Sequence, residues 1–468
     1  MAQTTLSEVA TGKKERHTAE ILAEKQQSIS ISEFFTKNRH LLGFDNPRKA
    51  LLTTVREAVD NALDACQEMK VLPEIRVIID ETSTDKYKVT VEDNGPGIVR
   101  QQIPNIFAKL LYGSKFHRLR QSRGAQGIGI SAAALYGQLT TGKPIRIISK
   151  IGPKAKAHYY ELHLNTKTNE PEIMKDEERE WEGKDHGTKV QIELEGKYQQ
   201  GKLSVDEFLQ LTAISNPEAT IIYKAPGSEV IEFARASQEI PKETKEIQPH
   251  PYGVELGTLM RMLKDTKSPT LQSFLQNDFC RVSASVAKEL CEKAELEERL
   301  KPSAISRDEV EKIFNAIKQT KIMAPPTDCL SPIGEEQMLK GLKKEINAEF
   351  YAAVTRPPVV YRGFPFELEV AIAYGGDLPK DEFARVIRYA NRVPLQHQPG
   401  ACALTRSIIQ TAWKNYNISQ SKGTLPSGPI VIMVHMASVW VPFTSESKEA
   451  VASYPEIIKE VRLALQDA

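Results

Sequence analysis

The sequence lacks any apolar run long enough to span a membrane, and its polar, charged start over residues 1–25 has no signal-peptide pattern. We therefore expect a cytoplasmic protein that makes no membrane contact. Cysteine is scarce and no two cysteines form a CxxC pair, which argues against a zinc or disulfide framework and predicts reduced thiols. The five cysteines are Cys66, Cys280, Cys291, Cys329 and Cys402.

The chain also lacks a GxxxxGKS/T motif, which excludes a phosphate-binding loop of that kind. An excess of charge of one sign is missing as well. The net charge of +1 predicts neither nucleic-acid binding nor its absence, because any basic surface would have to be local. At 468 residues, with 40% apolar and 26% charged residues, the chain is typical of a globular protein of two to four domains.

Four stretches of the chain differ in pattern. Residues 1–28 are polar and lack periodicity, so we expect a flexible N-terminal arm. Residues 29–229 mix helical patterns with alternating, strand-like runs, which is typical of an α+β domain. Three short apolar stripes predict a small helical domain over 230–305. Strand-like runs around a helical pattern predict an α/β domain with a βαβ unit over 306–468, which ends in a helix.

A helix is predicted over 47–69, and one of its faces carries polar side chains that could do chemistry. Glu57 can orient or deprotonate a water molecule, and Asn61, one turn later, can give Mg²⁺ a neutral oxygen ligand. Taken alone, this pattern is more typical of a solvated helix face. We expect Asp64 and Glu68, further along the same face, to be ordinary solvated surface.

Three further segments complete the candidate site. Asp93 ends the second strand of a predicted hairpin and can accept a hydrogen bond from the amine of adenine, while Gly95 and Gly97 let the backbone pass close to the base. The segment Gly124–Gly129 leads into a predicted helix, whose N-terminus favours phosphate. Thr188 offers a hydroxyl near the base. A β-turn or a flexible loop would explain each segment singly, but their fixed order favours a nucleotide site.

These segments resemble, in chain order, the N, G1, G2 and G3 boxes of the GHKL ATPases: Glu57–Asn61, Asp93–Gly97, Gly124–Gly129 and Gly187-Thr188. The resemblance implies a Bergerat-type α/β sandwich that binds ATP and Mg²⁺, with a lid over about 107–129. It makes Glu57 catalytic and Asn61 the metal ligand. The residues that it implies around the nucleotide are Asn61, Asp93, Gly95, Gly97, Ser114, Lys115, Gly124, Ala125, Gln126, Gly127, Ile128, Gly129, Ile130, Ser131 and Thr188.

Within this superfamily, the flanking motifs resemble those of the B subunits of archaeal type IIB DNA topoisomerases (topoisomerase VI). The motifs are Phe34-Phe35, Gly43–Pro47 and Trp413–Tyr416. The resemblance implies a helix-two-turn-helix domain and a transducer domain similar to ribosomal S5 domain 2. It also implies that Lys414 reaches the γ-phosphate from the transducer, with Lys422 as an alternative because it resembles the switch-loop lysine of gyrase.

The resemblance further implies an ATP-dependent homodimer that gates passage of double-stranded DNA. The break would be made by a partner A subunit in a heterotetramer of two A and two B subunits. Another ATP-gated clamp, of the mismatch-repair or chaperone type, is the alternative. A sensor kinase is disfavoured because only His17 and His40 precede the predicted helix, which leaves no room for its phospho-acceptor helix.

The helical domain carries basic side chains that could contact a DNA backbone, but several glutamates lie near them. A scaffold role and DNA contact are therefore both left open. The basic residues are Arg261, Lys264, Lys267, Lys288 and Lys293.

Overall fold

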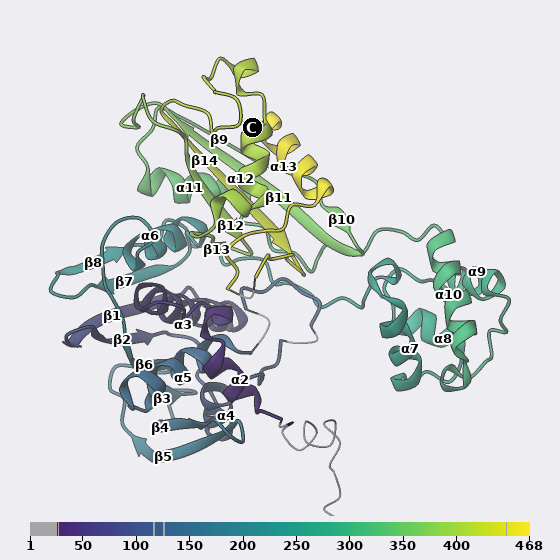
Figure 1. Cartoon of the computed structure of the whole chain (residues 1–468), viewed down its shortest axis with the longest axis horizontal. Helices are drawn as coiled ribbons and strands as arrows, with labels where there is room; N and C mark the ends of the chain where they lie inside the picture. Colours follow the sequence, from purple (N-terminus) through teal and green to yellow (C-terminus); the bar gives the residue numbers. More distant parts are fainter. Residues whose placement is uncertain (1–25, 27, 116–117, 125–126, 446) are drawn as a thin grey trace, which may run out of the picture.

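The computed structural model describes residues 26, 28–115, 118–124, 127–445 and 447–468. It consists of two sheet-containing domains packed against each other and a helical module that stands to one side of both (Figure 1). The expected α+β class with separate domains is confirmed. No helix in these ranges is long and apolar enough to cross a bilayer.

The first domain is built on an eight-stranded sheet with the order β5-β4-β3-β6-β2-β1-β7-β8, in which only β1 and β7 pair in parallel. Helices pack on this sheet over one continuous apolar core (Figure 1). The strands are β1 (Glu74–Ser83), β2 (Lys86–Glu92), β3 (Ile145–Lys150), β4 (Ala157–Asn165), β5 (Glu170–Arg179), β6 (Gly187–Glu195), β7 (Thr220–Lys224) and β8 (Val230–Phe233). The helices are α2 (Ile31–Lys37), α3 (Pro47–Met69), α4 (Ile103–Ala108), α5 (Gly129–Thr141) and α6 (Val205–Ser215).

Helix α3 is the element that organises the site, and it matches the predicted range of 47–69. Asn46 caps it by accepting a hydrogen bond from the backbone N–H of Lys49, and Pro47 stands at its first position, where a missing N–H costs nothing. Its apolar side, including Val55 and Leu63, is buried in the core of the first domain. Its polar side is therefore held facing a cavity.

The helical module contains α7 (Leu256–Asp265), α8 (Leu271–Asn277), α9 (Ala284–Ala294) and α10 (Arg307–Gln319) around a core of its own. The predicted boundary at 305 is therefore too early, because α10 packs on α7 and α9 through Val310 and Ile313. A capping box between Ser306 and Glu309 opens this helix. The amphipathic pattern of α10 lies within a charged stretch flanked by prolines, and for this reason the sequence analysis did not assign the helix to the module.

The second sheet-containing domain, called the second domain below, carries a sheet with the order β10-β11-β14-β12-β13 and β9 added on β11. Strands β12 and β14 pair in parallel around α12, so the predicted βαβ unit is present. The strands are β9 (Phe350–Thr355), β10 (Val359–Tyr361), β11 (Phe364–Tyr374), β12 (Arg385–Ala390), β13 (Val393–Pro394) and β14 (Ile430–Ser438). The helices are α11 (Glu335–Glu345), α12 (Ala403–Gln410) and α13 (Pro455–Asp467).

Candidate functional site

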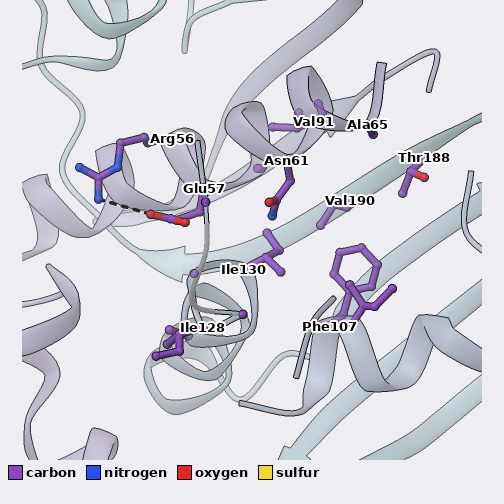
Figure 2. Close-up of a pocket in the computed structure, with 18 of the residues that line it drawn as sticks. Arg56, Glu57, Asn61, Ala65, Val91, Phe107, Ile128, Ile130, Thr188 and Val190 are labelled. Carbon is purple, nitrogen blue, oxygen red and sulfur yellow. Dashed lines mark hydrogen bonds and ion pairs between the residues drawn. The ribbon is translucent and has the colours of Figure 1, made fainter. Parts of the chain in front are cut away.

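A cavity of about 620 Å³ lies between α3, α4, the start of α5 and the sheet of the first domain. It brings together most of the residues that the sequence predicted, from four separate segments. The predicted residues in its wall are Glu57, Asn61, Asp93, Gly97, Ser114, Lys115, Gly124, Gly127, Ile128, Gly129, Ile130 and Thr188. Figure 2 shows several of them around the space between α3 and the strands.

Gly95 and Ser131, which were also predicted around the nucleotide, are not among the described residues of this wall. Ala125 and Gln126 lie outside the described residues. Ser131 is buried one turn into α5, where its hydroxyl donates to the carbonyl of Ile128 at 3.0 Å. The backbone N–H of Gly95 donates a hydrogen bond to the carboxylate of Asp93 at 2.8 Å.

At one end of the cavity, Glu57 projects from α3 toward the N-terminus of α5 (Figure 2). A Cβ on Gly129 would lie 1.8 Å from Oε2 of Glu57, so only glycine leaves room for this carboxylate. The guanidinium of Arg56 lies 3.4 Å from Oε1 of Glu57. A carboxylate held beside the N-terminus of a helix, where phosphates bind well, is suited to orienting a water molecule.

Asn61 lies one turn along α3, with its side chain exposed to the cavity (Figure 2). Its amide oxygen suits Mg²⁺, which takes few protein ligands and completes its shell from phosphates and water. Among the described residues no cluster of three or more histidine, cysteine or acidic side chains could hold a metal alone. The donor set therefore fits a metal that arrives with a polyphosphate.

Asp93 defines the other end of the cavity. One carboxylate oxygen, Oδ1, accepts backbone hydrogen bonds from Gly95 at 2.8 Å and Thr188 at 3.2 Å. Burial raises the pKa of Asp93 to about 6, against the lowering effect of these two bonds. Gly187 has φ +142°, and a Cβ there would lie 2.2 Å from the carbonyl oxygen of Asp93. The carboxylate is thereby fixed at the edge of an apolar patch that includes Val91, Phe107 and Val190, which is suited to a purine base.

The predicted lid contacts the far end of α3, and here the structure corrects an expectation. Asp64, expected as solvated surface, is 8% exposed and pairs with Lys115 at 2.5 Å and Arg123 at 2.8 Å. Burial opposes its ionisation, but these two cations outweigh burial and lower the pKa of Asp64 to about 2. Lys115 and Arg123 thus cover Asp64 on α3, which the helical periodicity of α3 alone could not show. Glu68 remains exposed, paired with Arg120.

Lys414, which the family resemblance predicts to reach the γ-phosphate, is not part of the described cavity wall. It is exposed on a short 3₁₀ turn, Trp413–Tyr416, which follows α12, and neither it nor Lys422 is among the described residues of the cavity wall. Trp413 is instead buried in the core of the second domain, and its indole N–H donates to the carbonyl of Ile408. The role of Lys414 toward a γ-phosphate therefore stays a prediction from the motif, because the motif carries no information about where the 3₁₀ turn lies relative to the cavity.

Lys448, which the sequence analysis did not single out, lines the cavity. It comes from the second domain, and its ammonium donates to the carbonyl of Arg123 in the lid at 3.0 Å. The sequence gives little signal for it, because a lysine in a polar loop has no periodicity to mark it. A short polar stretch, 444–449, between two apolar segments was the only local feature.

Comparisons with known proteins agree with this architecture. Residues 46–197 match the family described as "Histidine kinase-, DNA gyrase B-, and HSP90-like ATPase", and residues 325–468 match "Topoisomerase VI B subunit, transducer". Proteins named as the B subunit of type 2 DNA topoisomerase 6 are similar over nearly the whole chain. That of Methanococcoides burtonii is 53% identical over 96% of this chain and 72% of its own length. That of Archaeoglobus fulgidus is 51% identical over 95% and 74%.

The fold and the cavity together define an ATP-binding domain of the GHKL class joined to a transducer domain. The resemblance seen in the sequence motifs is thereby confirmed. The chain belongs to the family of type 2 DNA topoisomerase 6 B subunits, and it is an ATP-hydrolysing component of a type IIB DNA topoisomerase.

Proposed function

We propose that ATP binds with its adenine against Asp93 and Thr188 and its phosphates at the start of α5, near Lys115. Asn61 would hold Mg²⁺, which supplies charge neutralisation of the phosphates when bound. Glu57 orients and deprotonates the attacking water. The observation that carries this proposal is the placement of Glu57, Asn61 and Asp93 along one cavity of about 620 Å³.

Lys448, and not Lys414, is the transducer lysine in this proposal. A lysine from a second domain is a point charge that attracts a triphosphate more strongly than a diphosphate. Hydrolysis then changes which domain arrangement is favoured, because a ligand shifts an equilibrium by its differential affinity for the two states. The position of Lys448 in the cavity wall, with its ammonium on the lid backbone, supports this role.

At the level of the assembly, we propose that ATP brings two copies together through the N-terminal arm and the first domain. Closure would capture a DNA duplex for passage through a break made by an A subunit, in a heterotetramer of two A and two B subunits in the cytoplasm. Family membership supports this proposal. ATPase rates with and without duplex DNA and an A subunit test it, and a rate indifferent to both would contradict it.

The test of the site is Glu57→Ala. We expect ATP affinity to change by less than about threefold and turnover to fall by roughly 10²-fold or more, because the general base is lost while the base and phosphate contacts remain. Titration calorimetry with ATP and a phosphate-release assay measure the two quantities. Light scattering with a non-hydrolysable analogue checks that the variant still dimerises. Normal turnover would remove Glu57 from this role.

A further inference from the structure

The segment that carries Lys448 has an unusual backbone. Lys448 has φ +52°, a left-handed conformation that a side chain with a Cβ rarely adopts. Such conformations persist where surrounding contacts hold them, and they gather at functional sites. The contacts that hold Lys448 in place are therefore of functional interest.

The neighbouring residue, Glu449, is the buried anchor of this segment. Its side chain is 3% exposed and forms an ion pair with Lys49 of α3 at 2.5 Å. Its other oxygen accepts a hydrogen bond from the amide of Gln398, which also has a left-handed backbone, with φ +47°. Lys49 lies 3.0 Å from Asp45 as well, just before α3. Glu449 is thus bonded to Lys49 of the first domain and to Gln398 of the second domain.

Both members of the pair are charged at neutral pH. Burial opposes ionisation of Glu449, but its bond to Lys49 holds the pKa of Glu449 below its usual range. Burial likewise opposes the charge of Lys49, and the two carboxylates, Glu449 and Asp45, raise the pKa of Lys49 above its usual range. An ion pair of this kind is costly to break from one side, because the remaining charge stays buried without its partner.

The ion pair also has a fixed relation to the catalytic end of the cavity. Lys49 and Glu57 lie on the same helix, eight residues apart, which corresponds to about 12 Å along its axis. Glu449 is therefore tied to the helix that presents the proposed general base, and its neighbour Lys448 enters the same cavity. Helix α3 thus carries Glu57 of the first domain directly and holds Glu449 of the second domain through Lys49.

We propose that the Glu449–Lys49 ion pair is an interdomain anchor that positions Lys448 in the nucleotide cavity, which makes Glu449 a positioning residue for ATP turnover. The catalytic part of this inference rests on the proposed function of Lys448. The anchoring part does not, because it concerns the conformation of residues 447–452 in the nucleotide-free protein.

The anchor is tested with Glu449→Gln in the full chain, followed by amide hydrogen exchange. Backbone amides in this segment are bonded locally: that of Lys448 to the carbonyl of Ser445, and that of Ala452 to the carbonyl of Pro442. We expect exchange over 447–452 to accelerate roughly tenfold or more, and ATP kcat/KM to fall by a similar factor. The double variant Lys49→Glu with Glu449→Lys restores the opposite charges and should recover much of both losses.

Glu460→Gln is the matched control. Glu460, with a side chain 15% exposed, pairs with Arg356 within the second domain, so its loss should leave exchange over 447–452 and kcat/KM unchanged. Unchanged exchange in Glu449→Gln overturns the anchor. Faster exchange with unchanged kcat/KM overturns the positioning role. If Lys448→Ala keeps wild-type turnover, the proposed role of Lys448 fails, while the exchange data still decide whether the anchor exists.

Discussion

Gly129 illustrates how a residue without a side chain can decide the chemistry of this site. It leaves the space that the carboxylate of Glu57 occupies at the start of α5. No residue with a side chain fits at position 129, because any Cβ there would meet the carboxylate of Glu57.

Gly129→Ala is therefore predicted to displace the Glu57 carboxylate and reduce turnover by roughly 10²-fold, with a smaller effect on ATP binding. Phosphate release and calorimetry measure the two effects. Gly257→Ala is a suitable control, because a Cβ there meets no atom within 4 Å and Gly257 lies in the remote helix α7. Wild-type turnover in Gly129→Ala would show that the carboxylate has another acceptable position.

At the same scale, the positions of Glu57, Asn61 and Asp93 in one cavity could be anticipated from the sequence, because each residue is placed by a local element, a helix face or a strand end. Lys448 and the burial of Asp64 could not be predicted in this way. Both depend on contacts between segments far apart in the chain, Lys448 with the lid and Asp64 with Lys115 and Arg123. Spacing along one element carries no information about such contacts.

At the scale of elements, α3 was predictable over its full length because cap, proline and apolar stripe agree. The edge strand β5 was missed, since its charged, half-exposed residues do not alternate in the usual way. Charged side chains on an edge strand discourage pairing with other chains. The same charged residues remove the alternation of apolar and polar residues by which a strand is predicted.

Strand β11 gives a prediction of its own. Burial, together with the nearby charge of Glu369, raises the pKa of Glu367 from 4.5 to about 7. The unfolded chain therefore loses this proton at a lower pH than the folded protein, and the residue costs stability as pH rises from about 4.5 to 7. Glu367→Gln should raise the melting temperature relative to wild type at pH 8 and less so at pH 4.5. Calorimetry across this range measures the difference, and a pH-independent difference would contradict the shift.

At the scale of the whole molecule, two lysines of the second domain can be compared. Lys414 belongs to the sequence motif Trp413–Tyr416, whereas Lys448 lies in the cavity wall. Lys448→Ala should weaken the change in small-angle scattering that a non-hydrolysable ATP analogue produces, because the contact between transducer and triphosphate is lost. Lys414→Ala, exposed on its 3₁₀ turn, should scatter like wild type without DNA. The reverse result would mean that nucleotide binding carries Lys414 into the cavity.

The helical module has its own core and stands beside the other two domains, joined through the extended segments that precede α7 and follow α10 (Figure 1). No described residue of this module lines the cavity or bonds to Glu449. An exchange of the helical module between relatives is therefore expected to change what this module contacts, while ATP turnover by the other two domains stays the same.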